Sequence, residues 1–289
     1  MRIFAPHSIA LPLLLLSVPA WAEDPTPEAP GTPEEKDPLD QFKWQTTGKG
    51  SLGKAEVAIP EGLRFLGARD TSTLVEMMGN ISGHEEAGLI GTPDLSWFVV
   101  FFFDDVGYVK DDEKDSLDAD KMAATMREHL VESNEERRRR HLDELSFDGW
   151  AIAPRYNAES KQLEWAQKLR SVKGTSVNYN TRVLGRHGVM RVTLVTGPED
   201  LEAVLPAFHD MMKGFQFNGG EDYASFRAGD KVAEYGLIAL VAGGAGAVAA
   251  KTGLLSAAVI FLKKGAKLIA VAIAGLAAAV KKFFTRKPQ

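Results

Sequence analysis

The two ends of the chain constrain its architecture more than any other feature of the sequence. Residues 1–22 have the organisation of a secretory signal, with Arg2 at a positive start, a short apolar core over residues 9–18, and small residues at Ala20 and Ala22. We therefore expect cleavage after Ala22. An uncleaved anchor is the alternative, but the apolar core is shorter than the about 20 residues that a bilayer span needs.

The other end, residues 233–289, indicates a membrane anchor with a basic cytoplasmic end. The stretch from Leu237 to Leu262 carries one charge, Lys251, and as a helix would cross a hydrocarbon core about 30 Å thick. A second apolar stretch, residues 268–280, is shorter and has lysines on both sides. Two topologies stay open: a single span, which the flanking positive charge favours, or a helical hairpin formed by both stretches.

Small residues in the first stretch suggest self-association. Gly243 and Ala247, like Gly246 and Ala250, have the spacing that lets two membrane helices approach closely, although a span without a partner remains open. Residues 244–249 also match a dinucleotide-binding fingerprint. That fingerprint needs a later acidic residue, and none follows Glu234, so we expect no cofactor.

Charge and composition describe the part between the two ends. Residues 23–38 contain five prolines and six acids, which predicts a disordered Pro-rich, acidic linker. Residues 23–234 carry 25 basic and 39 acidic residues, a net charge of −14, whereas the later residues carry +8. Such an acidic domain disfavours nucleic acid as a ligand. The expected partners are the lipid bilayer and an unidentified protein or small molecule.

Residues 39–232 predict one exported α+β domain, an antiparallel sheet with packed helices. The aromatic and β-branched run 97–103 is typical of a central strand buried on both faces. Residues 186–188 indicate a hairpin turn. Because the apolar periodicity ends near residue 220, we expect truncation after Asp230 to leave a folded domain. Further strands are expected near 57–66 and at 149–156, 163–173, 176–184 and 189–195, and helices at 71–78, 118–145 and after 197–200.

Three local features of the helices follow from the sequence. Asp70 or Ser72 is the expected cap of the first helix. The arginines at 137–140 are expected on a solvated face, where Arg139 and Arg140 pair with the glutamates four residues before them, although an anion site is the alternative. Pro206 should kink the last helix, whose apolar face is expected to include Phe215.

No complete catalytic or metal motif is present, so we assign no catalytic, cofactor-binding or metal-binding residue. His84 and Glu85 begin a zinc-protease pattern, but Gly88 stands where its second histidine would be. Residues 104–120 resemble an incomplete calcium loop, which leaves a loose cation site open. Four aromatic residues are expected in the core, with a ligand pocket as the alternative: Trp97, Trp150, Trp165 and Tyr179.

Three segments together carry a family resemblance. They are residues 163–166 (LEWA), 179–188 (YNTRVLGRHG) and 235–253, which starts with Tyr235 and ends with Lys251-Thr252-Gly253. In these segments the chain resembles the bacterial family called domain of unknown function 2167. The resemblance implies a membrane-anchored protein and supplies no activity.

These observations predict a membrane-anchored envelope protein of unknown specific activity that serves as a non-catalytic binding or interaction module. Its location would be the bacterial inner membrane, with the main domain on the periplasmic side. The alternative is an envelope hydrolase with a site near His84. That alternative requires His84, Glu85 and Glu86 to converge with Arg182 or His187.

Overall fold

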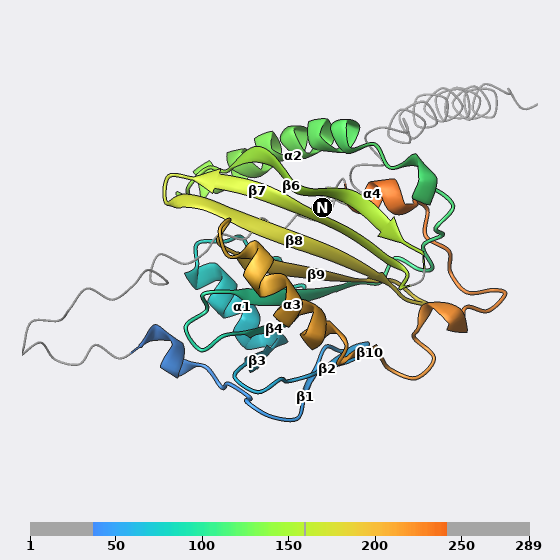
Figure 1. The fold of residues 1–289 in the computed structure, drawn as a ribbon, viewed down its shortest axis with the longest axis horizontal. Helices are drawn as coiled ribbons and strands as arrows, with labels where there is room; N and C mark the ends of the chain where they lie inside the picture. Colours follow the sequence, from blue (N-terminus) through green and yellow to red (C-terminus); the bar gives the residue numbers. More distant parts are fainter. Residues whose placement is uncertain (1–36, 159, 242–289) are drawn as a thin grey trace, which may run out of the picture. The chain divides into compact units, whose positions relative to one another are not determined.

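A seven-stranded antiparallel sheet forms the centre of the structure, a computed structural model that describes residues 37–158 and 160–241 (Figure 1). The strand order is β3-β4-β5-β9-β8-β7-β6. A smaller antiparallel sheet has the order β1-β2-β10. The strands of the large sheet are β3 (Arg64–Gly67), β4 (Glu86–Gly91), β5 (Phe98–Asp104), β6 (Ser146–Asn157), β7 (Gln162–Ser171), β8 (Gly174–Leu184) and β9 (Val189–Thr196), and those of the small sheet are β1 (Lys49–Ser51), β2 (Ala55–Ala58) and β10 (Phe215–Phe217).

Helices cover both faces of the large sheet. Helix α1 (Ala68–Met77) packs on β3 and β4, whereas α2 (Ala119–Arg139) packs on β6, near the opposite edge of the same face. Helix α3 (Leu201–Met212) packs on the other face, with the small sheet. Helix α4 (Leu237–Val241) joins the α2 side. The predicted α+β class with an antiparallel sheet and packed helices is confirmed.

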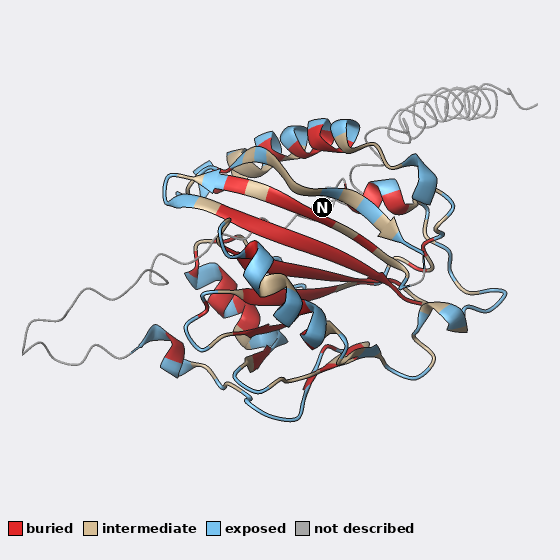
Figure 2. Ribbon diagram, viewed as in Figure 1, coloured by how far each residue is buried: buried red, intermediate tan, exposed pale blue. Residues whose placement is uncertain are grey.

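The sequence of β5 explains its central position between β4 and β9. Alternate residues of a strand point to opposite faces, and both sets in β5 are apolar. Phe98 and Val100 pack with α1, while Val99 and Phe101 pack in the core beneath α3. The central strands are buried along most of their length (Figure 2). The prediction of a central strand at 97–103 is therefore confirmed.

The turn between β8 and β9 lies where the sequence places it. The Gly185 N–H donates to the Gly188 carbonyl at 2.8 Å, and the two strands then pair in a continuous register. A Cβ on Gly188 would lie 2.0 Å from the carbonyl oxygen of Asp104. Only glycine fits this approach, which keeps the hairpin against the end of β5.

Several expectations near the helices are wrong. The cap of α1 is Gly67, not Asp70 or Ser72, and it makes no side-chain capping bond. Phe215 belongs to β10, which pairs with β2, because the helix ends at Met212. Arg137 is buried and donates to the carbonyls of Asp143 and Gly79, so it is not on the solvated face. Helix α3 continues through Pro206 as one element, and the kink expected at this proline stays a prediction.

The core also extends further along the chain than residue 220. Leu237, Leu240 and Val241 of α4 are buried against Trp165 of β7 and Val189 of β9. Helix α4 thus lies within the range predicted as membrane anchor, and the described structure packs it on the sheet. A protein truncated after Asp230 would therefore lack these three residues of the core.

The predicted membrane and targeting segments fall mostly outside the described residues. The signal (1–22), most of the linker (23–36) and the small residues from Gly243 to Ala250 are among them. Within the described ranges, no helix is both long and apolar enough to cross a bilayer.

Candidate functional site

The residues of the predicted hydrolase site do not converge. The exposed His84 imidazole lies 3.9 Å from Glu76 of α1. Glu86 is buried and accepts hydrogen bonds from Ser72 at 2.7 Å and Ser82 at 3.0 Å. His84 and Glu86 therefore interact with different residues and do not face a common site.

Glu85 and His187 have different partners again. Glu85 lies 3.4 Å from the Arg191 guanidinium on β9, whereas His187 Nδ1 lies 2.7 Å from Glu221. His84, Glu85 and Glu86 thus do not form the common site with His187 that the hydrolase alternative requires.

His187 instead belongs to an ionic cluster that fixes the β8–β9 turn to residues 218–232. Arg186 donates to both carboxylate oxygens of Asp230, at 2.7 and 2.8 Å. Glu221 pairs with His187 and with Lys54, the latter at 3.0 Å. Hydrogen bonds from Arg186 hold the pKa of Asp230 well below its usual range, and the bond with His187 lowers the pKa of Glu221. The geometry is that of a structural clamp.

This cluster predicts a pH dependence of stability. Because the folded-state pKa of Asp230 is depressed, its contribution is present above the unfolded-state pKa of about 3.9 and is lost as pH falls below that value. Asp230→Asn should therefore lower the free energy of unfolding at pH 7 and have a smaller effect at pH 3. Urea unfolding at pH 7 and pH 3 measures the free energy of unfolding of the variant. Asp115→Asn, at an exposed position, is the control. Equal destabilisation at both pH values would contradict the ionic role.

The acids of loop 104–120 also have protein partners. Asp111 accepts from the Tyr156 hydroxyl and from Lys161, both at 3.1 Å. Glu113 accepts from the N–H of Ile238 at 3.0 Å, and Asp118 caps α2. The described ranges contain no group of three or more potential metal ligands among their His, Cys, Asp and Glu side chains.

The aromatic residues divide between the two faces of the sheet. Trp165 packs with α4, while Tyr179 packs with Phe208 of α3, with ring centroids 5.3 Å apart. Both side chains are fully buried. Core packing thus accounts for them, and they do not line a common pocket.

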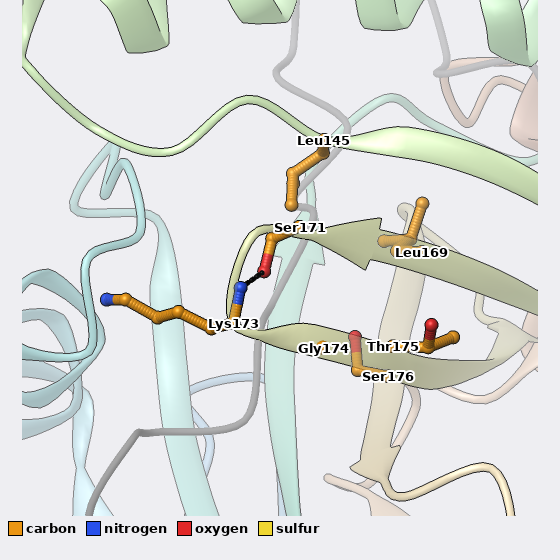
Figure 3. Close-up of a pocket in the computed structure, with 7 residues that line it drawn as sticks. All are labelled: Leu145, Leu169, Ser171, Lys173, Gly174, Thr175 and Ser176. Carbon is orange, nitrogen blue, oxygen red and sulfur yellow. Dashed lines mark hydrogen bonds between the residues drawn. The ribbon is translucent and has the colours of Figure 1, made fainter.

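A small pocket lies at the turn between β7 and β8 (Figure 3). Its volume is about 50 Å³. Its lining includes Leu145, Leu169 and Ser176, and the Lys173 N–H donates to the Ser171 hydroxyl at 3.1 Å within it. Ligand pockets usually measure about 300–1,000 Å³, so this pocket suits no more than a few waters.

The most unusual chemistry of the described structure lies on the sheet face that carries α1 and α2. Strands β7, β8 and β9 place buried polar side chains side by side there, in the interval between the two helices. We call this set the polar strip. It consists of Gln167, Asn178, Asn180, Arg182, Arg191 and Thr193, all buried.

Only part of the polar strip is internally hydrogen-bonded. The Thr193 hydroxyl donates to Asn180 at 3.0 Å, and Asn180 donates to the Asn178 carbonyl at 2.9 Å. Neither side-chain amide atom of Asn178, nor Nε of Arg182, has a hydrogen-bond partner within the part of the chain that the structure describes. More than about 90% of buried polar groups in proteins are satisfied, so these atoms require an explanation.

The two arginines of the strip are cross-strand neighbours with different environments. Arg191 pairs with the buried Asp104 at 2.9 Å. Arg182 stacks on Trp165, with its guanidinium carbon 4.6 Å from the ring centroid, and among the described residues it has no carboxylate at ion-pair distance. Burial, followed by the charge of Arg191, lowers the pKa of Arg182 to about 9, so it still carries its charge at neutral pH.

The sequence contained a signal for this strip that was open to two interpretations. Residues 178, 180 and 182 are polar, whereas 177, 179 and 183 are apolar apart from the tyrosine hydroxyl, and only Thr181 interrupts the alternation. Such alternation ordinarily marks a strand with one solvated face. The structure instead buries both faces, which the strand sequence alone does not reveal.

The fold and site together define an α+β protein with a two-faced antiparallel sheet and a buried, partly unsatisfied polar strip. The chain belongs to the family described as "Protein of unknown function (DUF2167)", whose model matches residues 44–276. The resemblance seen in the sequence is thereby confirmed.

Two further comparisons add little. No curated protein matches the chain. Among solved structures, the solution structure of cyanobacterial PsbP (CyanoP) from Synechocystis sp. PCC 6803 is similar over 57% of this chain and 87% of that chain, with 8% identity and a TM-score of 0.37. A likeness of this size supports no argument about the present protein.

Proposed function

We propose that the protein is a non-catalytic binding module of the cell envelope, anchored in the inner membrane with its main domain on the periplasmic side. The observation that supports binding is the unsatisfied part of the polar strip. A buried polar group without a partner costs about 1–3 kcal/mol. Three such atoms in one strip are explained if a ligand supplies their partners.

The location in this proposal rests on the sequence. The signal over residues 1–22, the apolar sequence that follows Val241 and the basic final residues support export and anchoring. The hydrolase alternative is disfavoured, since its three named residues make separate contacts.

A matched pair of variants on β8 tests the binding role. Asn178→Leu replaces an unpaired amide of the strip with an apolar side chain of similar volume. Thr181→Val removes an equally buried, unpaired hydroxyl from the opposite face of the same strand. Native mass spectrometry of the full-length protein, purified from its own membranes, should show a bound small molecule in the wild type and in Thr181→Val.

Asn178→Leu should lose that molecule and still fold. Equal occupancy in all three proteins would place the ligand elsewhere, and the absence of any bound molecule from the wild type would contradict the proposal.

A further inference from the structure

Arg182 presents hydrogen-bonding capacity that the described protein does not use. Its guanidinium carbon lies 4.6 Å from the Trp165 ring centroid, and among the described residues its hydrogen bond is a 3.4 Å contact from Nη1 to the Thr181 carbonyl. Nε is buried and unpaired. Burial and the contact with the Trp165 ring restrict the guanidinium, so the Nε–H is positioned before a ligand binds. Such a preorganised donor suits an oxyanion.

Tyr235 provides a second unused donor in the same region. Its hydroxyl is buried and has no hydrogen-bond partner within the described ranges. Burial, followed by the negative charge of Asp104, raises the pKa of Tyr235 to about 12, although the positive charges of Arg191 and Arg182 oppose the shift. At neutral pH the hydroxyl is therefore protonated and able to donate. Tyr235 lies two residues before α4, which packs on Trp165, so the same packing positions both donors.

Arg182 is the arginine of the strip that a negatively charged group can still approach directly. Arg191 is paired with Asp104 and approached by Glu85, whereas Arg182 has no carboxylate at ion-pair distance among the described residues. The surrounding residues 23–234 carry a net charge of −14, which repels polyanions. One guanidinium and one hydroxyl match a carboxylate or a phosphodiester, each of which bears a single charge.

We propose that the ligand of the polar strip carries one singly charged oxyanion, bound by Arg182 Nε and the Tyr235 hydroxyl. This inference rests on the proposed binding function and names the chemical class of its ligand. Asn178 lies on the same face of β8, about 13 Å from Arg182 at roughly 3.3 Å per residue. The unpaired amide of Asn178 then hydrogen-bonds a neutral polar group of the same molecule.

Small probes test the anion site in the full-length protein in detergent. Acetate and dimethyl phosphate represent the two sources of a single charge, and acetamide is the neutral counterpart of acetate. At constant ionic strength maintained with sodium chloride, we expect at least one of the two anions to raise the melting temperature and acetamide not to do so. A shift with acetate alone indicates a carboxylate ligand, and a shift with dimethyl phosphate alone indicates a phosphodiester.

Variants then assign the binding to the two donors. Arg182→Gln should weaken binding of the effective anion by about ten- to a hundred-fold, and Tyr235→Phe by several-fold, because each loses a hydrogen bond to a charged group. Arg182→Lys keeps the charge without the Nε–H and should give an intermediate affinity. Arg155→Gln, which removes an exposed arginine paired with Glu164, should bind like the wild type.

Two results would overturn the inference. They are the absence of any effect of both anions, and wild-type affinity in both Arg182→Gln and Tyr235→Phe. If the molecule that copurifies with the protein is uncharged and depends on Asn178, the proposed binding function stands while the anion assignment fails.

Discussion

Removing residues 231–289 should unfold or aggregate the domain, rather than release it in soluble form. Leu237, Leu240 and Val241 are buried against the sheet, and each fully buried side chain of this size contributes about 1.5–3 kcal/mol. Their loss is comparable with the total stability of an ordinary domain, about 5–15 kcal/mol. The same truncation removes the two backbone bonds that tie Lys231 and Ala233 to Tyr108.

Point variants in the full-length protein separate packing from chain length. Leu237→Ala and Leu240→Ala should each lower the free energy of unfolding by about 2–5 kcal/mol in urea titrations. Ile238→Ala is the matched control, since Ile238 is the exposed member of the same helix, and it should change stability by less than about 1 kcal/mol. A soluble, cooperatively unfolding fragment ending at Asp230 would show that α4 is dispensable, as the sequence periodicity suggested.

Asp104→Asn should strongly destabilise the fold, because Asp104 is the ion-pair partner of Arg191 in the polar strip. Asp104 pairs with Arg191 at 2.9 Å, and both side chains are about nine-tenths buried. Removing one partner of a buried ion pair costs about 3–5 kcal/mol, because the other charge remains buried and uncompensated. Here the effect is increased by Arg182, the cross-strand neighbour of Arg191.

Glu85→Gln is the control for this change. Glu85 also contacts Arg191, but its side chain is 37% exposed, and exposed ion pairs contribute about 0–1 kcal/mol. The double variant Asp104→Asn with Arg191→Met should recover much of the stability lost in Asp104→Asn, since no buried charge is then left without its partner. Urea unfolding measures all four proteins. A loss below about 1 kcal/mol in Asp104→Asn would contradict the role of this pair.

Two strands, β4 and β10, have sequences that do not indicate a strand. Strand β4 was not expected, because residues 86–91 combine a glutamate with two glycines and lack β-branched residues except Ile90. Strand β10 has three residues and is defined by its pairing with β2. Such short strands depend on partners that are distant in sequence, so local propensity carries little information about them.

Local sequence by itself determined the antiparallel α+β class, the central strand β5, helix α2 and the β8–β9 turn, since apolar periodicity and turn residues act over neighbouring positions. Tertiary structure alone decided what covers each surface. The alternation in β8 shows that its two faces differ, but only the packing of α1, α2 and α4 reveals that the polar face is buried. Likewise, the apolar residues of α4 suit a membrane or a core equally well, because both environments exclude water, and the contact with Trp165 decides between them for residues 237–241.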